Sequence, residues 1–272
     1  MGWLQAILLG IVQGLTEFLP VSSSGHLVLL QSLFGLKEPE LFFDVSVHVG
    51  TLLAVCVVFF RDLRDMALAF FSRSTWSAGN IGRLQQWRQV PEIRLITLIF
   101  IGSLPTAVLG LAFRPLAAIL FSSIRVVGIM LLVTGFLLWF TRPMKKKGRT
   151  ELTAWDAICV GMMQGLAILP GISRSGSTIA MGLFRGLDRE TAARYSFLLS
   201  IPAIVGAMAL ELAQAKISGM PPLGPAAVGA GVAGAVGYVA LKTLIGLVKK
   251  GALHTFAYYC WPLGGIVIFC SL

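Results

Sequence analysis

The residues best suited to chemistry in this sequence lie in a short polar stretch between Gln13 and His26, inside a chain dominated by apolar residues. The stretch contains the carboxylate of Glu17, three consecutive hydroxyls that begin at Ser22, and the imidazole of His26, and glycine and proline residues interrupt its backbone. An unpaired backbone group is very costly in hydrocarbon, so in a membrane such a segment is buried in protein or lines a wet cavity. We therefore expect these side chains to face an internal polar site.

A second polar stretch, from Gln164 to Thr178, carries an arginine among hydroxyl groups: Arg174 is flanked by Ser173 and Ser175. An arginine in the middle of a membrane is expensive and normally has a bound partner, and its planar fork suits a phosphate or a carboxylate. Helices that restart after each turn would point their N-termini at the same place, which also favours an anion. The two stretches together predict one active site with a cradle for phosphate oxygens.

The spacing of residues in the first stretch suggests how such a site would work. Glu17 follows Gln13 by four residues, so the two share one helix face and their oxygens could bind a hard divalent cation, Mg²⁺ or Ca²⁺, that bridges phosphate oxygens. His26 lies three residues after Ser23, within one helical turn. It could take a proton from a serine hydroxyl or a water, or protonate the leaving oxygen.

Structural roles are the alternatives for several of these residues. Glu17 could be no more than an ion-pair partner of Arg174, and His26 could be a core histidine with satisfied hydrogen bonds. A lone serine in a membrane helix is usually bonded to its own backbone, which is the role we favour for Ser24 and Ser177.

Composition places the whole chain in a membrane. Of its 272 residues, 56% are hydrophobic and only 12% are charged, with a mean hydropathy of +0.84, whereas a soluble domain carries about 25% charged residues. Several apolar runs reach the roughly 20 residues needed to cross the hydrocarbon core. The sequence therefore predicts an all-α polytopic membrane protein of the inner-membrane type. Asp44 and His48 lie at helical spacing in one of these runs and fit packing or a supporting role equally well.

The net charge of +10 does not indicate nucleic-acid binding, because of where the basic residues lie. They cluster between apolar runs, at Arg61–Arg94, Arg142–Arg149 and Lys249–Lys250. This pattern is typical of cytoplasmic loops and sets topology. The four cysteines lie in apolar runs without paired spacing, so we interpret them as small buried hydrophobes and not as metal ligands.

The apolar runs predict two re-entrant helix–loop–helix segments and six spans. The first segment, 3–36, is interrupted by a turn and opens to the outside; the second, 154–187, begins and ends on the cytoplasmic side. The predicted spans are 41–60, 93–113, 119–140, 193–213, 223–248 and 254–272.

An internal repeat supports this organisation, because seven residues recur at an offset of 151. Each half then holds one re-entrant segment and three spans, and an odd number of spans inverts the second half. We predict one membrane domain, 1–272, made of inverted repeats at 1–140 and 154–272. The recurring residues are Gly10, Gln13, Gly14, Leu15, Ser22, Ser24 and Gly25, which return as Gly161, Gln164, Gly165, Leu166, Ser173, Ser175 and Gly176.

These motifs resemble the undecaprenyl-diphosphate phosphatase family, also called the bacitracin-resistance phosphatases. The first family motif is matched by Gln13-Gly-Leu-Thr-Glu17 followed by Pro20-Val-Ser-Ser-Ser-Gly-His26, and the second by Pro170-Gly-Ile-Ser-Arg-Ser-Gly-Ser-Thr178. The likeness extends over the whole chain. Gln13 takes a place where many members have glutamate, which leaves one carboxylate fewer for a metal.

The resemblance implies a membrane hydrolase that converts undecaprenyl diphosphate to undecaprenyl phosphate and inorganic phosphate. Such an enzyme recycles the lipid carrier for cell-wall synthesis and confers bacitracin resistance. The resemblance also implies divalent-cation dependence and a site that faces the periplasm or outside. It assigns a catalytic set of Glu17, Ser23, His26 and Arg174, with Ser22, Ser173 and Thr178 as phosphate ligands. We also expect Ser175, beside Arg174, to bind the substrate phosphate.

Two other functions are compatible with the sequence. A flippase or transporter of a polyprenyl phosphate would use the same inverted architecture, but it does not require His26 beside Ser23. A Ser/His intramembrane protease fits less well, because Arg174 among hydroxyls suits a phosphate better than a peptide. The expected partners are the lipid substrate and the membrane, with a homodimer also open and no nucleic acid.

Overall fold

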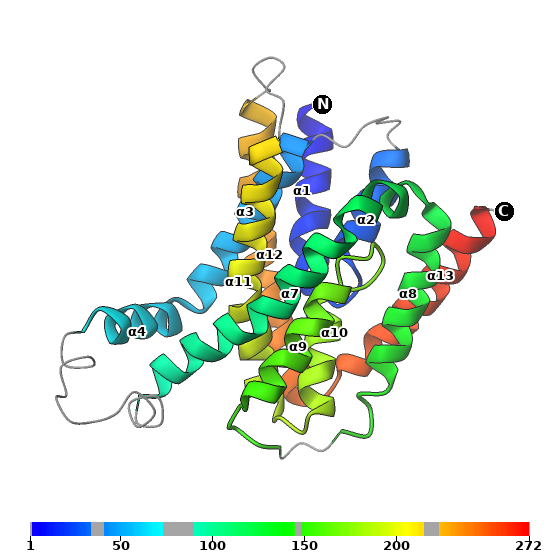
Figure 1. Cartoon of the computed structure of the whole chain (residues 1–272). Coiled ribbons are helices and arrows are strands. Elements are labelled where there is room, and N and C mark those ends of the chain that lie inside the picture. Colours follow the sequence, from blue (N-terminus) through cyan, green and yellow to red (C-terminus); the bar gives the residue numbers. More distant parts are fainter. Residues whose placement is uncertain (1, 34–40, 73–89, 145–147, 215–222, 272) are drawn as a thin grey trace.

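A computed structural model of the chain describes residues 2–33, 41–72, 90–144, 148–214 and 223–271 (Figure 1). Its described part is built from helices and contains no β-strand, so the prediction of an all-α polytopic membrane protein is confirmed. Four described helices are long and apolar enough to cross a membrane, or five if a bent pair counts as one span.

The first polar stretch forms the turn of a helical hairpin. Helix α1 (Trp3–Phe18) ends before Pro20, and α2 (Ser23–Leu33) begins after Ser22, whose backbone has a φ of +70°. Proline fixes its own φ and lacks an N–H, and a positive φ is uncommon for a residue with a side chain. These two residues together reverse the chain. Residues 34–36 of the predicted segment lie outside the described part.

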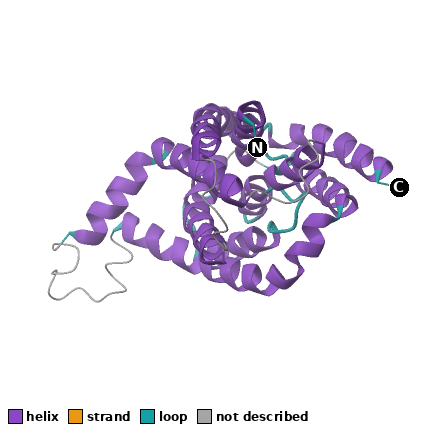
Figure 2. Ribbon diagram, turned by 90° about the horizontal axis from the view of Figure 1, so that it is seen from above, coloured by secondary structure: helices purple, strands orange, loops and turns teal. Residues whose placement is uncertain are grey.

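The second polar stretch forms a matching hairpin of α9 (Ala154–Leu166) and α10 (Arg174–Phe184). Gly171 takes the left-handed backbone conformation in its turn, with a φ of +99°. In Figure 1, α1 and α2 open toward the end of the bundle that carries the N-terminus, while α9 and α10 open toward the opposite end. Seen along the bundle, in Figure 2, loop segments lie within the area that the helices enclose.

The remaining helices surround the two hairpins. They are α3 (Leu41–Val58), α4 (Phe60–Phe71), α7 (Pro91–Ser122), α8 (Ile124–Trp139), α11 (Arg189–Gln214), α12 (Leu223–Lys250) and α13 (Ala257–Cys270), the last preceded by the 3₁₀ turn η1 (Leu253–Phe256). Helix α4 bends away from α3 by 77°.

The largest difference from the predicted boundaries lies at the end of α7. We expected spans 93–113 and 119–140, with a break between them, but α7 runs on through Pro115 to Ser122. A proline costs a helix one hydrogen bond, and membrane helices tolerate that loss because neighbouring groups satisfy the freed carbonyl. The break falls at Ser123, whose side chain caps α8 by accepting a hydrogen bond from the Val126 amide at 3.4 Å. Helix α8 is therefore shorter than the predicted span.

Glycines at the 151-residue offset make equivalent contacts in the two halves. A Cβ at Gly10 would collide with the Gly229 carbonyl of α12, and one at Gly161 with the Gly102 carbonyl of α7. The absence of side chains thus lets α1 approach α12, and α9 approach α7, at backbone distance. This pairing of each hairpin with the other half is consistent with inverted repeats.

The basic segments meet at one end of the bundle. Arg189 donates to the carbonyls of Met144 and Lys249, and Arg94 donates to that of Leu152. The loops after α8 and α12 and the start of α9 are therefore neighbours, as the charge pattern requires.

A buried aspartate holds this basic end together. Asp156 is fully buried and accepts hydrogen bonds from Arg149 at 3.0 Å and Arg185 at 2.9 Å, and it forms a capping box with Thr153 at the start of α9. Burial alone would raise the pKa of Asp156, but the hydrogen bonds from Arg149, Thr153 and Arg185 lower it from 3.8 to about 2.

We expect Asp156→Asn to destabilise the protein by about 2 kcal/mol or more, because it leaves two arginines without their carboxylate. Since the folded-state pKa of Asp156 is depressed from 3.8 to about 2, its stabilisation is complete above about pH 4 and is lost as the pH falls toward 2. Thermal unfolding in detergent measures both effects. Asp65→Asn is the control, because Asp65 pairs with Arg64 at the surface and should contribute under about 1 kcal/mol. Equal losses for the two variants would contradict this role.

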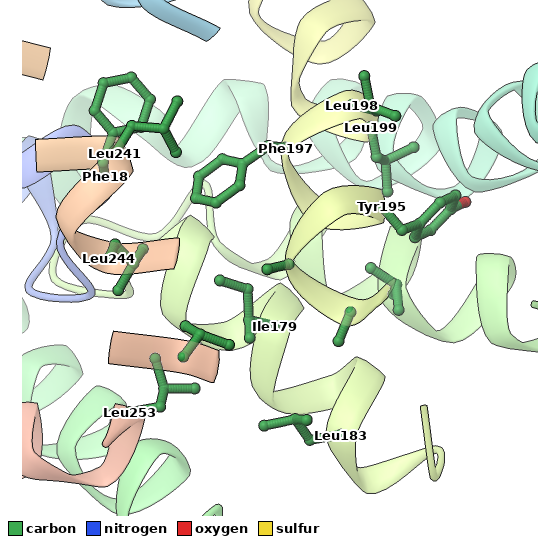
Figure 3. Close-up of a cluster of buried hydrophobic side chains, with 14 of the residues drawn as sticks. Phe18, Ile179, Leu183, Tyr195, Phe197, Leu198, Leu199, Leu241, Leu244 and Leu253 are labelled. Carbon is green, nitrogen blue, oxygen red and sulfur yellow. The ribbon is translucent and has the colours of Figure 1, made fainter. Parts of the chain in front are cut away.

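An apolar core lies beside the hairpin turns (Figure 3). Phe18, at the end of α1, packs edge-on against Phe197 of α11 with ring centroids 6.0 Å apart. Ile179 of α10 and Leu241 of α12 belong to the same cluster, and all four side chains are fully buried. This core fixes the end of the first hairpin helix against the second hairpin.

Candidate active site

The two hairpin turns touch each other, as the sequence predicted. The Gly171 amide donates to Ser22 Oγ at 3.1 Å, and Ser175 Oγ donates to the Phe18 carbonyl at 2.8 Å. Residues about 150 positions apart are thus held in direct contact. The two turns form one polar site inside the helical bundle.

Glu17 is the centre of that site. Its Oε1 accepts from Arg174 Nη2 at 2.5 Å, and its Oε2 accepts from Ser23 Oγ at 2.7 Å and from Gln13 Nε2 at 3.2 Å. The carboxylate is buried, with 7% of the side chain exposed. The site thus brings together three of the four predicted catalytic residues, and the alternative contact that we considered, an ion pair between Glu17 and Arg174, is present.

The Ser23 hydroxyl donates its hydrogen bond to Glu17. A serine hydroxyl that donates to a buried carboxylate can pass its proton to that carboxylate as the oxygen attacks an electrophile. The arrangement can therefore support nucleophilic attack by Ser23 next to a guanidinium.

His26 does not take the place that we expected. Its Nδ1 lies 2.8 Å from the Ser22 carbonyl, and its Nε2 lies 2.8 Å from Tyr259 Oη of α13. In this conformation the ring is turned toward α13 and does not bond to Ser23, and the role of His26 in proton transfer stays a prediction. A carbonyl only accepts, so Nδ1 carries the proton and neutral Nε2 accepts from the tyrosine.

Tyr259 was missed by sequence reasoning, and no signal in the sequence marks it. It lies 233 residues from His26, and its ring stacks on the imidazole with centroids 5.8 Å apart. The packing of α13 against α8, which also contacts α2, brings the two together. His48 is the second addition: its Nε2 lies 3.9 Å from Glu17 Oε2. The spacing of Asp44 and His48 on one apolar helix was the available signal.

The predicted phosphate-binding hydroxyls shape the turns. Ser22 Oγ accepts from the Gly25 amide, and Ser173 Oγ from the Gly176 amide, at 3.3 and 3.1 Å. Thr178 Oγ1 donates to the Arg174 carbonyl at 2.7 Å. Each hydroxyl thus supports the backbone next to Glu17 or Arg174, and its contact with a phosphate stays a prediction.

Two buried polar atoms at the site have no hydrogen-bond partner among the described residues: Arg174 Nη1 and Gln13 Oε1. A buried group without a partner costs free energy, so such atoms mark places where a ligand fits. Arg174 Nη1 is a donor suited to a phosphate oxygen, and Gln13 Oε1 is an acceptor suited to a cation. The side chains of the site therefore fit both a phosphate and a divalent cation.

The sequence is similar to known proteins over nearly its whole length. A family model described as bacitracin resistance protein BacA matches residues 6–266. The chain is 51% identical to an undecaprenyl-diphosphatase of Desulfatibacillum aliphaticivorans, with 98% of both chains covered. It is 52% identical to one of Desulfosudis oleivorans, with 99% of this chain and 98% of the relative covered, and 44% identical to one of Halothermothrix orenii, with 97% and 96% covered.

Proposed function

The chain belongs to the BacA family of bacitracin resistance proteins, and on that basis we propose that it hydrolyses undecaprenyl diphosphate to undecaprenyl phosphate and inorganic phosphate. The observation that carries the proposal for this site is the contact of Glu17 with both Arg174 and Ser23. A guanidinium, a carboxylate and a hydroxyl in one buried cluster suit phosphoryl transfer. The released monophosphate lipid returns to cell-wall synthesis, and depletion of the diphosphate lipid accounts for bacitracin resistance.

In the proposed mechanism Arg174 holds the terminal phosphate through its free Nη1. Ser23 Oγ attacks the terminal phosphorus while Glu17 takes the hydroxyl proton. The Oγ–P bond forms, the bond from phosphorus to the bridging oxygen breaks, and the prenyl monophosphate leaves with that oxygen. Glu17 gives this proton to the oxygen of the leaving monophosphate and becomes a base again. Water then attacks the phosphoserine phosphorus while Glu17 takes a proton from the water. The Oγ–P bond breaks, Glu17 returns the proton to Ser23 Oγ, and inorganic phosphate departs.

A divalent cation, Mg²⁺ or Ca²⁺, is part of the proposal. Gln13 and Glu17 would hold it, through the amide oxygen without a partner and the carboxylate. When bound, such a cation neutralises the charge that develops on phosphate oxygens.

The predicted role of His26 in proton transfer depends on the direction of its ring. Tyr259 sets that direction by donating to Nε2, while the Ser22 carbonyl sets the tautomer. We expect Tyr259→Phe to lower kcat by about tenfold with little change in KM, because the ring loses its orientation. Initial-rate kinetics on pure protein measure the effect. Tyr258→Phe is the matched control: Tyr258 packs against Trp139 and Trp261 and should retain its rate within about twofold. Equal rates for both variants would contradict the role of Tyr259.

We further propose that the protein lies in the bacterial plasma membrane with its basic end in the cytoplasm. The clustering of Arg149, Arg185, Arg189 and Lys249 at one end supports this orientation through the positive-inside rule. The first hairpin then opens to the outside, which is where the predicted site faces.

The deciding experiment is phosphate release from a long-chain prenyl diphosphate by the pure protein in detergent, with and without chelator. Hydrolysis needs no separate compartments, whereas a flippase would show no product there. We expect phosphate release that falls when the cation is removed. Absence of release from folded, cation-loaded protein would refute the proposed activity.

A further inference from the structure

His48 faces the catalytic carboxylate in a way that calls for a positive charge between them. Its Nδ1 lies 2.7 Å from the Asp44 carbonyl, so Nδ1 must carry a proton and neutral Nε2 is an acceptor. That Nε2 lies 3.9 Å from Glu17 Oε2, which is also an acceptor. Two acceptors that face each other attract a cation or a proton.

A third acceptor lies against the same carboxylate. Gln13 is fully buried and donates through Nε2 to Glu17 Oε2, and its Oε1 has no partner among the described residues. The amide oxygen, the carboxylate oxygen and the imidazole nitrogen come from α1 and α3, which pack together. Two of these three atoms have a lone pair that no described donor uses.

The two side chains lie close to the separation of shared metal ligands. Neighbouring ligands of one octahedral cation, each at about 2.1 Å from it, lie about 3 Å apart, so the 3.9 Å between His48 Nε2 and Glu17 Oε2 closes by about 1 Å when a cation binds. Metal-bound histidines commonly donate the other ring N–H to a backbone carbonyl, as His48 does to Asp44.

The other two histidines, both in described segments, lack this arrangement. His26 Nε2 is occupied by Tyr259, and His254 bonds the Gly251 carbonyl near the basic end. His48 alone of the three pairs with a carboxylate through Nε2. Replacement of His26 is therefore the control for replacement of His48 in any experiment that detects a histidine nitrogen on the cation.

We propose that His48 is a nitrogen ligand of the catalytic divalent cation, together with Glu17 and Gln13. The inference rests on the proposed function and deepens it. An imidazole ligand favours a first-row transition-metal ion over Mg²⁺ or Ca²⁺, which prefer oxygen alone, and Mn²⁺ is the ion of that series that also suits carboxylate and amide oxygens. In this chain glutamine replaces one carboxylate of the family motif. His48 then supplies the third ligand atom and shifts the preferred cation from Mg²⁺ or Ca²⁺ toward Mn²⁺.

Electron spin-echo spectroscopy of Mn²⁺ on the pure, metal-free protein without substrate tests the proposal. We expect coupling of the Mn²⁺ spin to one directly bound ¹⁴N nucleus in the wild type and in His26→Ala. His48→Ala should lose the coupling and bind Mn²⁺ about tenfold or more weakly. His48→Gln offers an oxygen instead, so it should lose the coupling and shift the competition between Mn²⁺ and Ca²⁺ toward Ca²⁺.

The outcomes separate this inference from the proposed activity. A wild-type spectrum without ¹⁴N coupling at saturating Mn²⁺, or coupling that persists in His48→Ala, overturns the ligand assignment and leaves an imidazolium paired with Glu17. Phosphate release, measured on the same samples, reports on the hydrolase activity whether or not the coupling is seen. A circular dichroism spectrum identical to that of the wild type confirms that the variants are folded.

Discussion

Replacing Ser23 by alanine is expected to lower kcat for prenyl diphosphate hydrolysis by about a thousandfold or more, because it removes the proposed nucleophile. Ser23 Oγ lies 2.7 Å from Glu17 Oε2, so the acceptor for its proton is already in place. KM should change little, since Arg174 and the turn amides remain. Initial rates of phosphate release from the pure variant measure the loss.

The adjacent residue supplies a matched control. Ser24 has the same side chain and lies one position further along α2, but its hydroxyl contacts Ser22 Oγ at 3.3 Å and not Glu17. We expect Ser24→Ala to retain its rate within about threefold. Similar rates for Ser23→Ala and Ser24→Ala would exclude Ser23 as the nucleophile. They would favour attack on the phosphorus by a water that Glu17 holds and deprotonates.

The second large effect is expected for Arg174→Ala, which should lower kcat/KM by about a thousandfold or more. Arg174 is the cationic group that pairs with Glu17, and its Nη1 has no other partner among the described residues. Its loss removes the ligand of the terminal phosphate and leaves the Glu17 carboxylate buried without a counter-charge. KM should therefore rise and kcat should fall.

One further variant separates charge from geometry at this position, and an exposed arginine elsewhere supplies the control. Arg174→Lys keeps the charge and loses the planar fork, so it should recover only part of the activity. Arg125→Ala removes an exposed arginine that contacts the Ser271 carbonyl at 3.4 Å, and it should behave as the wild type. Full activity of Arg174→Lys would show that a point charge suffices and that the guanidinium need not bridge Glu17 and the phosphate.

The pairing of Arg174 with Glu17 could be predicted from the sequence because charges inside a membrane must be compensated. Two broken, polar segments in an apolar chain leave few other places for such charges to meet. The turns were equally predictable, since Pro20, Gly171 and the serines beside them cannot continue a helix without cost.

The orientation of His26 could not be predicted in the same way. Its spacing from Ser23 fits contact within one helical turn, but ring direction depends on a rotamer and on what packs beside it. Tyr259 decides that direction, and it belongs to the last helix of the chain. The end of α7 was missed for a related reason, because Pro115 is tolerated where neighbouring helices compensate for the lost hydrogen bond.

The central claim is that Ser23, Glu17 and Arg174 form one site for phosphoryl transfer, and a structure of the pure protein with bound vanadate tests it most directly. The account predicts vanadium bonded to Ser23 Oγ, with an equatorial oxygen about 3 Å from Arg174 Nη1. Vanadate bonded to His26, or bound away from Arg174 with Ser23 still donating to Glu17, would contradict it.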